Sequence, residues 1–191
     1  MRDIVEESFR ESARLQLAFL EGHLDLIVRA SEAVVRALRA GGKILLFGNG
    51  GSAADAQHIA AELVNRFLLD RRALPAIALT TDSSVITSIS NDRDYAQVFA
   101  RQVEALGRPG DVAIGISTSG QSASVVRGLE TASTLQMCTV ALTGGDGGKL
   151  APLVDYAFVV PSRSTPRIQE IHATLGHVLC QLVETELFGE P

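Results

Sequence analysis

The side chains best placed to do chemistry form two pairs, each spaced to share one side of an expected helix. His58 and Glu62 are four residues apart, which puts both on one face. Gln169 and His177 are eight apart, or about 80° around a helix, so they also share a side. A carboxylate and an imidazole that meet can work as general acid and base. A single pair of this kind is more often a solvated helix contact, so spacing alone leaves both interpretations open.

Two segments rich in glycine and hydroxyl groups follow apolar runs and lead into expected helices. The run GNGGSAAD at 48–55 would let backbone amides approach an anion at a helix start. The run STSGQS at 117–122 brings four hydroxyl groups to another helix start, more than capping requires. Further polar side chains, at 80–84, follow another apolar run at 76–79. Together these groups predict a phosphate monoester as the ligand.

Other motifs fit the first segment less well. It matches the dinucleotide pattern G-x-G-x-x-A, but Asp82 follows roughly thirty residues on, where about 20 are expected for a ribose-binding acid. The sequence has no Gly-Lys-Ser/Thr of a nucleotide P-loop. An ordinary tight turn between strand and helix stays compatible with the glycines alone.

Short apolar runs alternate with helical patterns beyond residue 42. Strands are expected at 43–47, 76–79, 112–116, 138–142 and 156–160, and helices at 53–67, 95–106, 123–135 and 166–188, with a short one near Leu150. Residues 80–94 are expected to be a polar loop. The pattern predicts an α/β fold, a three-layer αβα sandwich with a five-stranded parallel sheet. Ligands of such sheets bind beyond the carboxyl ends of the strands, where the polar loops lie.

A long helical pattern over residues 3–40 precedes the first strand and ends at two glycines. Gly22 and His23 predict a bend or short break within it. Its apolar side chains exceed what one such sheet could cover, and they include Ile4, Phe9, Leu15, Phe19, Leu24 and Ile27. An exposed patch of this size is unusual for a monomer, so residues 1–40 are predicted to be an oligomerisation arm.

Composition narrows the function classes. The chain has 191 residues, 46% apolar and 20% charged, which predicts one globular domain over residues 1–191. A net charge of −5, no cluster of Lys or Arg, and only 5% aromatic residues argue against nucleic acid as a partner. Cys138 and Cys180 are expected to be buried thiols of a reducing compartment. The acidic start and the lack of a long apolar stretch predict a cytoplasmic protein without a signal peptide or membrane span.

Taken together, the motifs resemble a known family across essentially the whole chain. The segments that carry the resemblance are 48–63, the SND at 90–92, the STSGQS at 117–122, the RIQEIH at 167–172, and His177. They closely resemble the phosphoheptose isomerases, sugar-isomerase (SIS) domain enzymes that act on sedoheptulose 7-phosphate. The flavodoxin-like fold of that family agrees with the predicted sheet.

The resemblance implies a role for each matching residue. It implies an acid–base pair of Glu62 and His177. It implies a phosphate cradle of Ser52, Ser117, Thr118, Ser119 and Ser122, and sugar contacts from Asn49, Gly50, Gly51, Asn91 and Asp92, with Glu62 and Gln169 also touching substrate. Some members bind one zinc ion per subunit at positions matching His58, Glu62, Gln169 and His177, although Gln is an unusual zinc ligand.

The implied reaction is aldose–ketose isomerisation through an enediol. It would convert sedoheptulose 7-phosphate to D-glycero-D-manno-heptose 7-phosphate, the first step toward ADP- or GDP-heptose and, in some bacteria, lipopolysaccharide. The resemblance also implies a homotetramer with active sites at subunit boundaries.

Two non-enzymatic alternatives come from the same family. Non-catalytic paralogues bind the bacterial replication initiator protein as scaffolds, but they lack the acid matching Glu62 and the histidine matching His177, and this chain has both. A sugar-phosphate sensor would be expected to carry a DNA-binding region, for which the sequence offers no segment. The enzyme is therefore the favoured hypothesis.

Overall fold

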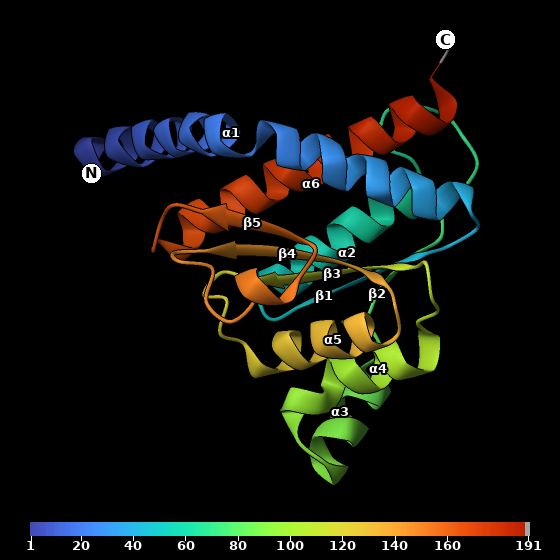
Figure 1. Ribbon diagram of the computed structural model, residues 1–191. Helices are drawn as coiled ribbons and strands as arrows, with labels where there is room; N and C mark the ends of the chain where they lie inside the picture. Colours follow the sequence, from blue (N-terminus) through green and yellow to red (C-terminus); the bar gives the residue numbers. More distant parts are fainter. Residues whose placement is uncertain (190–191) are drawn as a thin grey trace.

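The computed structural model describes residues 1–189, and their strands form one parallel sheet (Figure 1). These strands are β1 (Ile44–Gly48), β2 (Ala76–Ala78), β3 (Val112–Ser117), β4 (Cys138–Gly144) and β5 (Tyr156–Val160). Their order is β2-β1-β3-β4-β5, with every neighbouring pair parallel. The order reverses between β1 and β3, so a ligand crevice is expected there. The predicted α/β sheet is confirmed, while Glu190 and Pro191 of the predicted domain 1–191 lie outside the described residues.

Helices cover both faces of the sheet. They are α1 (Arg2–Arg39), α2 (Gly51–Val64), α3 (Ser83–Asp92), α4 (Val98–Leu106), α5 (Ala123–Thr134) and α6 (Thr165–Phe188), with short 3-10 turns η1 (Tyr95–Gln97) and η2 (Ala151–Leu153). In Figure 1, α1, α2 and α6 lie on one face, and α3, α4 and α5 lie on the other. Successive β1 side chains alternate between the two cores: Ile44 joins the first and Leu45 the second. Burial on both faces explains why the strands appear as continuous apolar runs.

Two local expectations are wrong. Helix α1 runs unbroken through Gly22, because the buried side chains of Phe19 and Ile27 on either side hold it against the first core. Part of the expected polar loop at 80–94 is the helix α3. Its hydroxyl side chains bond back to its own carbonyl oxygens, as Ser90 does to Ile86 at 2.7 Å. In the sequence, these polar residues mask the pattern of a short helix, whose apolar side chains Ile86 and Ile89 pack on the second core.

The apolar side chains of helix α1 differ in burial along its length. Leu15, Phe19 and Ile27 are buried in the first core. Ile4, Phe9 and Leu24 remain 69%, 76% and 56% exposed, and the first turns of α1 extend past the rest of the molecule in Figure 1. The described chain therefore leaves an apolar stripe on α1 uncovered. Although α1 is long, none of the helices within residues 1–189 has a stretch apolar enough for a membrane span.

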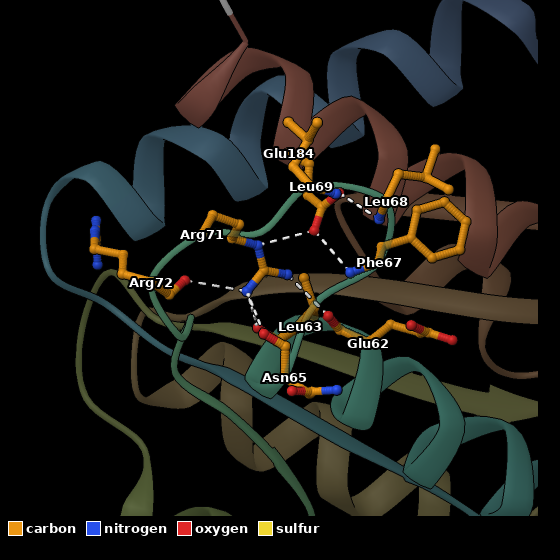
Figure 2. Close-up of polar contacts among 9 residues, drawn as sticks. All are labelled: Glu62, Leu63, Asn65, Phe67, Leu68, Leu69, Arg71, Arg72 and Glu184. Atoms are coloured by element: carbon orange, nitrogen blue, oxygen red, sulfur yellow. Dashed lines mark hydrogen bonds and ion pairs between the residues drawn. The ribbon is translucent and has the colours of Figure 1, made fainter.

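A buried ion pair joins α6 to the segment that follows α2 (Figure 2). The Glu184 carboxylate accepts hydrogen bonds from Arg71 Nε at 2.9 Å and from the backbone N–H groups of residues 67–69 at 2.7–3.0 Å. Arg71 in turn donates to the carbonyl oxygens of Glu62 and Leu63, at 2.8 and 2.7 Å, where α2 ends. Both charged side chains are only 2% exposed. The pair therefore fixes the end of α2 against α6.

The same donors set the titration of Glu184. Burial raises the pKa of this carboxyl, but three backbone N–H groups and Arg71 outweigh burial and hold the pKa below its ordinary value. A lowered folded-state pKa means that the unfolded chain binds more protons as the solution becomes acidic. The stabilisation is therefore present above the unfolded pKa of about 4.5 and is lost as pH falls through the lower folded pKa.

We predict that Glu184→Gln lowers the free energy of unfolding at pH 7 by on the order of 3 kcal/mol, because it leaves Arg71 buried without its counter-charge. Urea unfolding from pH 7 to pH 3 measures the effect, and the difference from wild type should narrow below about pH 4.5. Glu186→Gln is the matched control, since the Glu186 side chain is 60% exposed on the same helix. A pH-independent difference would contradict the assigned protonation.

Candidate active site

Three ionisable side chains from α2 and α6 converge in one cluster. The His58 Nε2 atom lies 3.2 Å from Glu62 Oε1 and 3.4 Å from His177 Nε2. The candidate ligand atoms of all three residues lie within 4.8 Å of one another. The Phe67 ring stacks on His177 with centroids 5.5 Å apart, which limits the movement of that imidazole. Glu62 and His177, 115 residues apart in sequence (177 − 62), therefore share one site.

Missing side chains let α2 and α6 pack closely enough for this cluster to form. A Cβ at Gly176 would lie 2.8 Å from two carbon atoms of Ile59, closer than packed atoms allow. About two turns nearer the start of each helix, the Gln169 amide occupies the space that a Cβ at Gly51 would need. The two glycines thus set the helix separation on which the site depends.

Gln169 is on the same helix interface but away from the other predicted metal ligands. Its amide lies against Gly51 at the first turn of α2, whereas His58 and Glu62 are on later turns. Of the four residues assigned to zinc by resemblance, the structure thus brings three together and places the fourth toward the sugar-contact loop.

His172 is a structural histidine rather than a member of the cluster. It is fully buried, and its Nε2 atom lies 3.1 Å from the carbonyl oxygen of Thr143 at the end of β4. Burial lowers the pKa of His172 to about 4, even though the contact with the Thr143 carbonyl opposes this shift. The ring is therefore neutral at pH 7 and donates to Thr143, which anchors α6 to the sheet.

Asp55 is a carboxylate near the site that sequence reasoning missed. It precedes His58 by three residues on α2, which places the two on adjacent positions of one face. Burial raises the pKa of the Asp55 carboxyl, and the nearby charge of His58 opposes the rise. Its Oδ2 atom is buried and has no hydrogen-bond partner within residues 1–189. The sequence signal was weak, because an acid three residues from a histidine is common on exposed helices.

The predicted phosphate loops lie at the carboxyl ends of β1 and β3, on either side of the crevice between these strands. Gly50 has a φ of +56° at the start of α2, a conformation that favours glycine, and Ser52 is buried in the first turn. Gly120 has a φ of +64°, and its carbonyl accepts from Lys149 N at 2.9 Å, which braces the second loop against the glycines that follow β4. The backbone amides that begin α5 can therefore face an anion, whereas the Ser52 and Ala53 amides at the start of α2 donate to the carbonyl oxygens of Asn49 and Gly50 at 3.0 Å.

The five residues predicted to contact phosphate differ in their exposure to solvent. Ser52 and Ser117 are buried, Thr118 and Ser122 are half-buried, and Ser119 is exposed. Thr118 and Ser119 line a hollow together with Ser162, Arg163 and Thr165, at the start of α6. Ser122 is the residue that begins α5, yet within the described chain its hydroxyl makes no capping bond to that helix. The first amides of α5 are therefore available to an anion.

Asn49 connects these loops through its side-chain amide. Its Nδ2 atom donates to Ser122 Oγ at 2.8 Å and to Ser124 Oγ at 3.0 Å. Its Oδ1 atom accepts from the hydroxyl group of Tyr95 at 2.7 Å. Sequence reasoning named Asn49 and Ser122 but missed Tyr95 and Ser124, since neither has a local pattern that marks it.

Asn91 and Asp92, the remaining predicted sugar contacts, lie at the end of α3. Both are exposed, and Asn91 Nδ2 donates to Asp92 Oδ1 at 2.8 Å. They precede the turn η1, whose Tyr95 bonds Asn49, so this segment is attached to the crevice by that contact. Among residues 1–189, no hydrogen bond joins the side chains of Asn91 and Asp92 to the cluster of His58, Glu62 and His177.

Comparisons of sequence place this chain among known proteins. A family model described as "SIS domain" matches residues 8–144. The phosphoheptose isomerase of Aquifex aeolicus is 59% identical over 184 residues, covering 96% of this chain and 96% of the relative. That of Thermodesulfovibrio yellowstonii is 52% identical over 191 residues, covering 100% of this chain and 95% of the relative.

Solved structures agree with these sequence matches. The phosphoheptose isomerase of Neisseria gonorrhoeae matches with a TM-score of 0.92 at 44% identity, covering 96% of this chain and 98% of its own. The enzyme from Francisella tularensis also gives a TM-score of 0.92, at 38% identity, covering 96% of this chain and 97% of its own. With matches that span nearly the whole chain in both sequence and structure, this protein belongs to the SIS domain family, among the phosphoheptose isomerases.

Proposed function

We propose that this protein interconverts sedoheptulose 7-phosphate and D-glycero-D-manno-heptose 7-phosphate. The observation that carries the proposal is the convergence of Glu62 and His177 from separate helices, with His58 Nε2 3.2 Å from Glu62 and 3.4 Å from His177. The phosphate-binding loops lie on the same edge of the sheet, at the carboxyl ends of β1 and β3. Reacting centre and phosphate anchor are thus available to a single sugar phosphate.

The isomerisation needs two proton movements, which suit this pair. One group removes a proton from the hydroxymethyl carbon of the ketose, next to the carbonyl, and the other supplies a proton to the carbonyl oxygen, so that an enediol forms. Return of a proton to the former carbonyl carbon and loss of one from the oxygen of the original hydroxymethyl group give the aldose. A carboxylate and an imidazole are both suited to these transfers near neutral pH. Because Glu62 lies on α2 and His177 lies on α6, the two side chains can approach a substrate from neighbouring helices.

The phosphate would be held away from this chemistry. The hydroxyls of Ser52, Ser117, Thr118, Ser119 and Ser122, with the amides that begin α5, offer donors to its oxygen atoms. Helix starts carry partial positive charge, which favours a dianion. We assign Asn49, Gly50, Gly51, Asn91, Asp92 and Gln169 to contacts with the sugar chain.

The cluster also fits a zinc ion. Ligand atoms around a tetrahedral zinc with bonds of about 2.0–2.1 Å are separated by roughly 3.3–3.4 Å. The His58–Glu62 and His58–His177 contacts, at 3.2 and 3.4 Å, agree with that spacing, and two imidazoles and a carboxylate are suitable donors. We propose that these three residues and Gln169 hold the metal. When bound, zinc would polarise the sugar carbonyl.

The exposed stripe on α1 supports a homotetramer. Ile4, Phe9 and Leu24 are more than half exposed, and a stripe of this kind is unusual on a monomeric surface. Packing against the same helix of another copy would bury it, which symmetric assemblies commonly achieve. We propose that the α1 stripe is the subunit interface and that the active sites lie at the subunit boundaries.

We predict that Glu62→Gln and His177→Ala each lower kcat by about 10²–10⁴-fold, because each removes one of two proton-transfer groups. Conversion of sedoheptulose 7-phosphate to the aldoheptose phosphate measures the rate. Circular dichroism and thermal unfolding check the fold, and Glu130→Gln, on the exposed part of α5, controls for charge removal. A variant with near-wild-type turnover would remove that residue from the mechanism.

Metal analysis of the purified protein should find about one zinc ion per chain, and His58→Ala should weaken zinc binding at least tenfold by loss of one ligand. Elemental analysis and competition with a chromogenic chelator measure these values. Removal of the metal with a chelator should lower activity, and added zinc should restore it. If the protein holds no stoichiometric metal and the chelator has no effect, the cluster serves acid–base chemistry alone.

Phe9→Glu should dissociate the assembly, because it places a charge among the exposed apolar side chains of α1, where Phe9 is 76% exposed. Deletion of residues 1–20 is a poorer test, since it also removes the buried side chains of Leu15 and Phe19. Light scattering and sedimentation measure the mass, with Ser133→Glu on α5 as an exposed control. A wild-type protein that is monomeric and fully active at nanomolar concentration would overturn the interface.

A further inference from the structure

A chain of hydrogen bonds leads from Tyr95 to the phosphate loop through one amide. The Tyr95 hydroxyl lies 2.7 Å from Asn49 Oδ1, and Asn49 Nδ2 lies 2.8 Å from Ser122 Oγ. The second Nδ2 hydrogen goes to Ser124 Oγ at 3.0 Å. These residues come from four places in the fold: η1, the loop after β1, the residue before α5, and the first turn of α5. The contacts therefore span the crevice between β1 and β3.

The donors and acceptors of each group fix the direction of these hydrogen bonds. A carbonyl oxygen only accepts and an amide nitrogen only donates, so the Tyr95 hydroxyl donates to Oδ1 and both serines accept from Nδ2. The two serine oxygens are 3.2 Å apart, and Ser124 is buried. When Ser124 donates its proton to Ser122, the Ser122 proton has no acceptor within this group. It is then available to an oxygen atom of a ligand.

The opposite orientation of the Asn49 amide would reverse this result. Its two ends have nearly the same shape, so only its hydrogen-bond partners decide which end faces the serines. A carbonyl turned toward Ser122 and Ser124 would accept their protons and direct them away from the crevice. A phenol is a stronger donor and a weaker acceptor than a serine hydroxyl, so Tyr95 favours the orientation that turns Oδ1 toward it, and in that orientation the serines keep their protons for a ligand.

The backbone around Tyr95 is held firmly enough for this task. Asp94 caps η1 by accepting from the Ala96 N–H at 3.0 Å. The residues that follow, Ala96, Val98 and Phe99, are buried in the second core or next to it. The Tyr95 hydroxyl is thus presented from a fixed turn, although its ring is partly exposed.

We infer that Tyr95 is a positioning residue for phosphate recognition: through Asn49 it orients the Ser122 hydroxyl to donate to the phosphate group of the substrate. This inference rests on the proposed function, in which Ser122 belongs to the phosphate cradle. Tyr95 acts through another residue and takes no part in the proton transfers at Glu62 and His177. Its loss should therefore weaken binding more than it slows the chemical step.

The test is Tyr95→Phe, which removes only the hydroxyl. Calorimetric titration with inorganic phosphate should show a Kd raised about three- to tenfold, the usual effect of one lost hydrogen bond. The KM for sedoheptulose 7-phosphate should rise by a similar factor, with kcat much less affected. Tyr156→Phe removes the hydroxyl of the other tyrosine, on β5, and should leave both constants unchanged. An unchanged phosphate Kd and KM in Tyr95→Phe would overturn the inference.

A double-mutant cycle with Ser122→Ala separates the two proposals. If Tyr95 acts through Ser122, Ser122→Ala should weaken phosphate binding and Tyr95→Phe should add little in that background. Fully additive effects would show that Tyr95 does not act through Ser122 and would overturn the inference while leaving the cradle intact. Normal phosphate binding by Ser122→Ala itself would instead contradict the assignment of the cradle in the proposed function. Thermal unfolding of each variant should match wild type within a few degrees, which excludes misfolding as the cause.

Discussion

The buried charge of Glu184 is the constraint on which the arrangement of the site depends. A carboxylate removed from water must be matched by donors, and here Arg71 and three backbone amides supply them. Arg71 is also buried and needs acceptors, which it finds at the end of α2, including the carbonyl oxygen of Glu62. Figure 2 shows how one pair of charges therefore connects α6, the end of α2 and the chain between them. His177 lies about two turns before Glu184 on α6, so the same fixation brings it to Glu62.

The sheet topology supplies a second, independent part of the site. Because all strands are parallel, their carboxyl ends lie at one edge, and the reversal of order between β1 and β3 is where a ligand crevice is expected. Asn49 follows one of these strands and Ser122 follows the other, so their hydrogen bond closes across the crevice. Tyr95 reaches the same amide from the helical layer on the second face. The proposed phosphate site thus combines loop, helix start and the packing of both layers.

Helix α1 joins the interior of the domain to its surface. Its later turns contribute Leu15, Phe19 and Ile27 to the first core, while its first turns leave Ile4 and Phe9 in solvent. The same length that lets α1 cover the sheet thus carries its first turns beyond it, where nothing in the described chain covers them. This geometry links the stability of the subunit to its association, since one continuous helix serves both.

The sequence by itself determined the features that depend on neighbours along the chain. Apolar runs with glycine-rich ends predicted the parallel sheet, and the loops at 48–55 and 117–122 predicted where an anion would bind, because strand burial and helix starts have local signatures. Family resemblance then selected Glu62 and His177. The resemblance also grouped His58 with them, but only the tertiary structure showed that Gln169 lies against Gly51, that Arg71 pairs with Glu184, and that Tyr95 bonds Asn49. These contacts join residues 46 or more positions apart, and their distances are set by how helices pack on a sheet, which no local pattern encodes.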